Sequence, residues 1–169
     1  MVLTKPELIA ALQDEVRILL HLASKIDPAK LDYRPTPKQR STVELLKYLS
    51  MMGPALVQAA KAGAFDGAAW TAAEQAAAAQ SYEQALASIA AQPGTYAALL
   101  ADVSEADLRA DVDPFGAGKT SRGAFLVTQV LCSCAAYRTQ LFLYLKACGR
   151  EELNTWNLWV GIDEPPAAK

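Results

Sequence analysis

Hydrophobic positions recur along this chain with the spacing of α-helices. From Leu8 to Ala23 the apolar side chains follow a 3.6-residue period, which predicts a first helix after Thr4 that ends near Asp27 and Pro28. Three residue pairs have the spacing of a capping box and predict helix starts: Thr4 with Glu7, Ser41 with Glu44, and Ser81 with Gln84. In such a pair the first side chain caps a backbone amide and the second returns the hydrogen bond.

The second predicted helix begins at Ser41 and carries an apolar stripe toward Gly63. We expect Pro54 to bend this helix and Gly63 to end it. Before it, residues 28–40 contain three prolines and predict a long irregular connection. After it, residues 63–80 are rich in alanine and glycine around Trp70, and we expect a loop there with one short helix after Thr71.

Two further helices are predicted in the second half of the chain. Residues 81–101 keep one apolar phase across Pro93 and Gly94, which favours one kinked helix over two separate helices. Residues 111–121 predict a loop rich in turns, and the last helix is expected from 122 to 147 with Gly149 as its cap. Trp156 and Trp159 follow, and side chains of this size are expected to dock on the bundle.

These elements predict an all-α protein. The expected fold is a four-helix bundle with long connections and a kinked third helix, and residues 1–169 are expected to form a single domain because no linker divides them. No strand pattern stands out anywhere along the chain.

Composition and charge exclude several classes of partner. Apolar residues make up 52% of the chain, charged residues 20%, and the formal net charge is −2 without a basic patch, so nucleic acid is not expected to bind. No signal peptide and no apolar run of about 20 residues are visible, which predicts a cytoplasmic protein without a membrane span. The cysteines Cys132, Cys134 and Cys148 all fall in the last predicted helix, and we expect them to be reduced.

Candidate chemical motifs are incomplete. Residues Gly116–Thr120 resemble a phosphate-binding loop, but that loop needs a glycine where Asp113 stands and a preceding strand, so a flexible turn is the better interpretation. His21 is the only histidine, and it has no second imidazole with which to chelate a metal. The carboxylates form no convergent pair.

The last predicted helix carries two polar lines. At 100° per residue, one sector of about 80° contains only uncharged polar residues. These are Gln129, Ser133, Tyr137, Gln140 and Tyr144, and the second line contains Thr128, Thr139 and Lys146. Lys146 marks the second line as the better solvent face, so the first line predicts a cleft wall or a buried polar network. The alternative that both lines are simple surface stays open.

Three sequence blocks resemble the DinB-like superfamily. They are residues Leu31–Pro35, Ser41–Leu49, and Tyr137–Leu141 followed by Gly149. The first is similar to the family's L-x-Y-R-P connector and the second to the opening of its second helix. The third is similar to its His-Arg-Gly-Gln-Leu segment in the last helix. The blocks occur in the family's order and spacing, so the resemblance extends over most of the chain.

The resemblance implies a four-helix bundle that is often dimeric. Many members bind a divalent metal through three histidines, and some use it to activate a small thiol for transfer or isomerisation reactions. The three ligand positions correspond here to Tyr48, Ser133 and Tyr137, which supply no imidazole. Phenols and a hydroxyl are poor ligands for zinc or nickel, so we expect the metal triad to be lost and predict no metal and no other cofactor.

The resemblance and the polar line together predict a pocket for a small molecule. The expected lining residues are Tyr48, Met52, Gln129, Ser133, Tyr137 and Gln140. The predicted protein is thus DinB-like, metal-free and homodimeric, with a cleft whose ligand the sequence does not identify. Two alternatives remain: a thiol-dependent transferase or isomerase of changed mechanism with Tyr48 or Tyr137 as proton donor, and a non-catalytic dimeric structural module.

Overall fold

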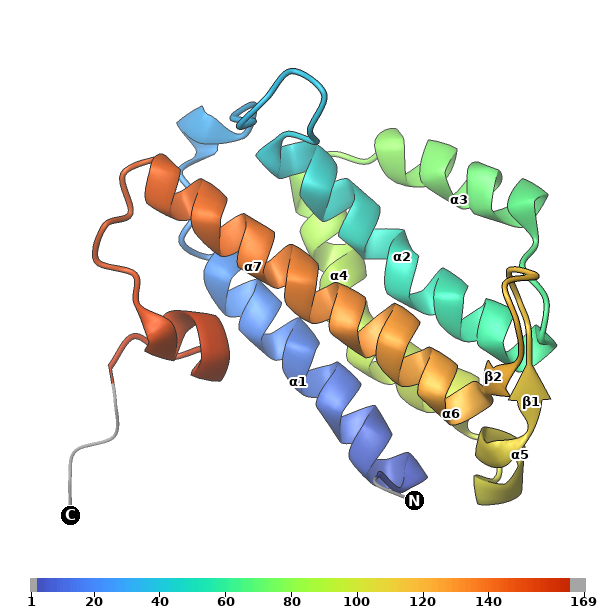
Figure 1. Ribbon diagram of the computed structural model, residues 1–169. Coiled ribbons are helices and arrows are strands. Elements are labelled where there is room, and N and C mark those ends of the chain that lie inside the picture. The colour runs from blue at the N-terminus through green and yellow to red at the C-terminus, as the bar shows by residue number, and fades with distance from the viewer. Residues whose placement is uncertain (1–2, 165–169) are drawn as a thin grey trace, which may run out of the picture.

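Helices dominate the computed structural model, which describes residues 3–164 (Figure 1). Four long rods form a bundle: α1 (Lys5–Ala23), α2 (Thr42–Ala62), α4 (Tyr82–Leu100), and a last rod of α6 (Arg122–Phe125), the π-helical segment η2 (Leu126–Leu131) and α7 (Cys132–Ala147). α1 and α2 each pack on both α4 and the last rod. The predicted all-α four-helix bundle is confirmed.

The local signals at the helix ends are also confirmed. Thr4, Ser41 and Ser81 each cap their helix in a complete capping box. Gly63 ends α2 with a φ of 69°, a left-handed conformation that favours glycine. α4 runs through Pro93 as one helix, as the continuous apolar phase predicts.

The core lies between the four rods and is almost purely apolar. Each rod contributes side chains with no exposed surface, among them Leu12, Leu45, Ile89 and Leu141. These residues occupy the positions that the 3.6-residue period assigns to the inner face of each helix. The hydrophobic pattern therefore determines which face of each rod turns inward.

Residues 63–80 differ from the expected loop, because most of them form α3 (Gly67–Ala78). Asp66 caps this helix by accepting hydrogen bonds from the amides of Ala68 and Ala69, and alanine is the best helix former. α3 lies outside the bundle and packs on α2 (Figure 1). The prediction of a loop with one short helix was wrong here.

The turn-rich segment contains a small hairpin after α5 (Glu105–Arg109), where no strand was expected. β1 (Asp111–Val112) pairs antiparallel with β2 (Thr120–Ser121). At the tip, the Asp113 carboxylate accepts a hydrogen bond from the Gly118 amide at 3.2 Å. A carboxylate already occupies the turn that resembles a phosphate loop, which disfavours a bound phosphate there.

The C-terminal segment docks on the bundle, although its tryptophans stay partly exposed. η3 (Trp156–Val160) contacts α1 and α7, and Asn157 is 2% exposed. Trp156 and Trp159 keep 38% and 62% of their surface exposed. The Arg138 guanidinium carbon lies 5.4 Å from the centroid of the Trp159 ring. The segment therefore docks on the bundle as expected, but both tryptophan side chains keep part of their surface exposed.

Candidate functional site

Tyr48 stands at the centre of a cluster of aromatic and cationic side chains. It lies in the second turn of α2 and is half-buried. The Arg40 guanidinium carbon is 3.8 Å from the Tyr48 ring centroid, a cation–π contact. The rings of Tyr137 from α7 and Trp70 from α3 pack edge-to-face with it at centroid distances of 5.3 and 6.2 Å. Three helices and one loop thus converge on this residue.

A groove of about 380 Å³ opens beside Tyr48, between α2 and α3. Its lining residues are Arg40, Glu44, Lys47, Tyr48, Met51, Glu74, Ala77 and Ala78. Arg40 and Glu74 face each other with 4.0 Å between nitrogen and oxygen, and Lys47 donates to the carbonyl of Ala78 at the end of α3. The groove therefore has an apolar and aromatic wall with both signs of charge around it.

Arg40 is held over Tyr48 by the polar line of α7. The Tyr144 hydroxyl donates to the Arg40 carbonyl at 2.9 Å and accepts from the Gln140 amide. The Tyr33 ring packs edge-on against Tyr144 with centroids 5.5 Å apart. Gln140 and Tyr144 therefore position the loop that carries the cation.

The aromatic contacts continue from Tyr48 to α3, the hairpin and α6. A row of six rings, each within 6.2 Å of the next, runs through Tyr137, Tyr48, Trp70, Phe65, Phe115 and Phe125. A second hollow of about 240 Å³ lies between α2 and α3 and is lined by Phe65 and Trp70. We call the groove, this hollow and the row of rings the aromatic cleft.

The Tyr48 phenol is held in its neutral form. Burial raises its pKa well above the usual 10.0, and the neighbouring phenol of Tyr137 raises it further, while Arg40 acts with a smaller effect in the opposite direction. A phenol in this environment is protonated at neutral pH and is a poor general base.

The six residues expected to line a pocket lie in different places. Tyr48 and Tyr137 are in contact, as described. Met52 is 1% exposed and belongs to the core, whereas its neighbour Met51 lines the groove. Gln140 lines a separate hollow between α7 and the 33–39 loop. Ser133 is half-buried and Gln129 is exposed.

The π-helical segment explains why the expected polar line divides. A π-helix has more residues per turn than an α-helix, so side chains in η2 no longer follow the 100° spacing. Gln129 lies inside η2, while Tyr137, Gln140 and Tyr144 follow in regular α7. Arg40 and Trp70 could not be assigned to the site from the sequence. Arg40 lies in an irregular loop, and Trp70 lies in a helix that was not predicted.

The positions of the family's metal ligands do not fit a zinc or nickel ion. Tyr48 and Tyr137 lie together, but the Tyr48 phenol is protonated and Ser133 offers only a hydroxyl. Such ions prefer imidazole and thiolate ligands. Within residues 3–164, no three His, Cys, Asp or Glu side chains gather where they could hold a metal.

Comparisons with known proteins bear on the fold. No protein-family model and no curated protein sequence matches this chain. A crystal structure of the DinB-like protein YjoA from Bacillus subtilis matches with a TM-score of 0.65 and 19% identity, over 87% of this chain and 95% of that one. This chain has the DinB-like fold. The DinB-like bundle places Tyr48 on α2 opposite Tyr137 on α7, where the resemblance puts two of the family's ligand positions.

Other expectations are tested only in part. No helix among residues 3–164 is long and apolar enough to cross a membrane. The expected homodimer and cytoplasmic location stay predictions.

Proposed function

We propose that this DinB-like protein binds a small molecule with a planar aromatic ring in the aromatic cleft. The observation that carries the proposal is the convergence of Arg40, Tyr137 and Trp70 on Tyr48 beside an open groove. Ligand sites are concave, mostly apolar, and contain a few placed polar groups. The groove combines aromatic and apolar residues with four charged ones.

The charged residues around the groove determine which charged substituents the aromatic ligand can have. Arg40 and Lys47 can pair with an anionic group, and Glu74 with a cationic one. Arg40 and Glu74 approach each other only to 4.0 Å and are partly exposed, so their mutual attraction is weak. A ligand group can replace that contact at little cost.

Binding is favoured over acid–base catalysis at this site. The raised pKa of Tyr48 makes the phenol a weaker acid and leaves almost no phenolate to act as a base. The cluster supplies rings and cations but no activated nucleophile. This supports a binding role over the alternative of a transferase that uses Tyr48 for proton transfer.

The test compares 2-naphthoate binding, measured by calorimetry, in the unmodified protein and in Tyr48→Leu and Tyr48→Phe. We expect Tyr48→Leu to weaken binding at least tenfold, about 1.4 kcal/mol, because the ring that stacks on the ligand is lost. Tyr48→Phe keeps the ring and should bind nearly as well. Thermal unfolding of each variant verifies that the fold persists.

Tyr82→Leu is the matched control. Tyr82 is the first residue of α4 and lies outside the cleft, so its replacement should leave the affinity unchanged. Equal affinities for the Tyr48→Leu and Tyr82→Leu variants would contradict the proposal.

A further inference from the structure

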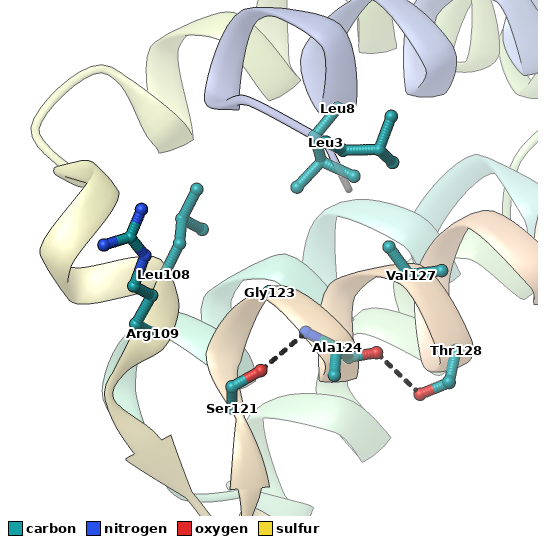
Figure 2. Close-up of a pocket in the computed structure, with 9 residues that line it drawn as sticks. All are labelled: Leu3, Leu8, Leu108, Arg109, Ser121, Gly123, Ala124, Val127 and Thr128. Carbon is teal, nitrogen blue, oxygen red and sulfur yellow. Dashed lines mark hydrogen bonds between the residues drawn. The ribbon is translucent and has the colours of Figure 1, made fainter. Parts of the chain in front are cut away.

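A second and larger cavity lies at the other end of the bundle. It has a volume of about 540 Å³ and opens between the start of α1, α5 and the start of the last rod (Figure 2). Its lining residues are Leu3, Leu8, Leu108, Arg109, Ser121, Gly123, Ala124, Val127 and Thr128. None of them lines the groove at Tyr48 or the hollow at Trp70, so this is a separate site.

The wall of this cavity is apolar even where hydroxyl groups are present. Figure 2 shows leucines and Val127 around the opening. The Thr128 hydroxyl donates to the Ala124 carbonyl at 2.9 Å, and the Ser121 hydroxyl accepts from the Ala124 amide at 3.2 Å. Both hydroxyls are thus engaged with the backbone of the last rod, which leaves a mostly apolar wall for the body of a ligand.

The shape of the cavity depends on a close approach of two backbones. A Cβ at Gly123 would lie 3.1 Å from the Leu108 carbonyl oxygen, which is tighter than ordinary contact. Glycine therefore lets α5 pack against the first turn of the last rod. This brings Leu108 into the wall and leaves the next residue, Arg109, at its edge (Figure 2).

Among residues 3–164, Arg109 is the one charged residue that lines the cavity. It ends α5, its side chain is exposed, and its guanidinium lies beside Leu108 at the side of the cavity (Figure 2). Other arginines are engaged: Arg122 donates to the Ala60 carbonyl, and Arg138 pairs with Glu15. Within residues 3–164, no hydrogen bond or salt bridge engages the Arg109 guanidinium, which is therefore free to bind an anion.

We propose that this cavity binds a small anionic amphiphile, with its apolar tail among the leucines and its carboxylate on Arg109. The volume lies within the range of about 300–1,000 Å³ for small-molecule sites. Guanidinium pairs with carboxylate through two parallel hydrogen bonds. A medium-chain fatty acid has this combination of an unbranched apolar body and one charged end.

The test measures decanoate binding to the full chain by calorimetry. Ala124→Phe places a ring in the cavity and should weaken binding at least tenfold. Arg109→Gln should weaken decanoate binding about fivefold, because a charged hydrogen bond is lost at an exposed site, and should leave binding of uncharged decanol unchanged. Lys119→Gln, which removes an exposed cation from the hairpin, is the matched control and should bind decanoate normally.

Thermal unfolding verifies each variant, and Val127→Phe serves as a second cavity-filling change. Decanoate binding that survives both filling variants would overturn the assigned site. Equal effects of Arg109→Gln on decanoate and decanol would overturn the assigned head-group contact. Tyr48→Leu should bind decanoate normally. Loss of decanoate binding in Tyr48→Leu would place decanoate in the aromatic cleft and refute this proposal. Failure of the protein to bind naphthoate would contradict only the proposed function of the aromatic cleft.

Discussion

Gly53 determines how closely α2 and α4 can approach at the centre of the bundle. A Cβ at this position would lie 2.0 Å from the Tyr96 hydroxyl oxygen, so no side chain fits unless Tyr96 moves. Tyr96 has no exposed surface, and its hydroxyl donates to the Gln92 side chain at 3.2 Å. Gly53 therefore leaves space for the buried Tyr96 phenol, while Gln92 supplies its hydrogen bond.

Gly53→Ala is expected to destabilise the protein by about 1–3 kcal/mol, because overpacking forces the Tyr96 ring out of place. Adding Tyr96→Phe removes the clashing oxygen. The double variant should therefore lose less free energy of unfolding than the two single variants lose in sum. Urea denaturation measures each free energy of unfolding.

Gly94→Ala supplies the control for the change of residue type. Gly94 is also inside a helix, and a Cβ there would meet nothing within 4 Å, so this change should stabilise by about 0.5–1 kcal/mol. A Gly53→Ala variant as stable as Gly94→Ala would contradict the close approach.

At the scale of an element, α2 contains a proline that leaves one backbone carbonyl without a partner, and the neighbouring helix α4 supplies a donor to it. Pro54 has no amide hydrogen, so the Ser50 carbonyl loses its normal partner in α2. The Gln92 side chain of α4 donates to the carbonyls of Leu49 at 2.7 Å and Ser50 at 3.2 Å. A buried glutamine thus satisfies the backbone that the proline leaves free.

Gln92→Leu is expected to destabilise by about 1–3 kcal/mol, because the buried Ser50 carbonyl would lose its partner and the Tyr96 hydroxyl would lose its hydrogen bond to Gln92. Gln75→Leu changes an exposed glutamine on α3 in the same way and should cost less than about 0.5 kcal/mol. Chemical denaturation of the two variants compares them. Equal stabilities would show that the Gln92 side chain is dispensable to α2.

At the scale of the whole molecule, charged and polar side chains fasten the C-terminal segment to the bundle. Arg138, 3% exposed, pairs with Glu15 at 2.8 Å and donates to the Leu158 carbonyl. Asn157 lies with its amide nitrogen 3.2 Å from His21 Nε2. The same amide nitrogen also reaches the Ile162 carbonyl and the Asp163 carboxylate, so its two hydrogens are shared among three acceptors, and a bond to Nε2 forms only when Nε2 is unprotonated. The docking therefore involves a group that titrates near neutrality.

The pH dependence of stability follows from the environment of His21. Burial lowers its pKa below the usual 6.5, and the cations Lys25 and Arg17 lower it further, against the opposing effect of Asp163. The unfolded chain then binds the proton first as the pH falls. Neutral His21 therefore makes its full contribution to the free energy of unfolding above pH 6.5. This contribution is lost as the pH drops through the lower pKa of His21 in the folded state.

We expect the free energy of unfolding of the unmodified protein to fall when the pH is lowered from 7.5 to 5.5. In His21→Gln it should fall less, because glutamine can accept the Asn157 hydrogen bond without titrating. Chemical denaturation at both pH values measures the difference. Glu15, whose pKa burial raises from 4.5, contributes with the opposite sign and is common to both proteins. Parallel losses in the two proteins would exclude His21 as the titrating group.

Half of the candidate site could be predicted from the sequence. Tyr48 and Tyr137 were expected together from the resemblance, and they meet across α2 and α7. Arg40 and Trp70 could not be assigned, because no local pattern tells where an irregular loop or an external helix comes to rest. The large cavity near Arg109 left no sequence signal, since its walls come from three separate segments.

The sequence by itself determined the starts of the four rods, the inner face of each rod and the all-α class. Capping boxes and the 3.6-residue period act within a few residues, so they can be recognised without the fold. Only the tertiary structure decided the π-helical turn, the stacking of Arg40 on Tyr48, and the exposure of Trp159. These depend on contacts between residues far apart in the chain, whose energies no local pattern contains.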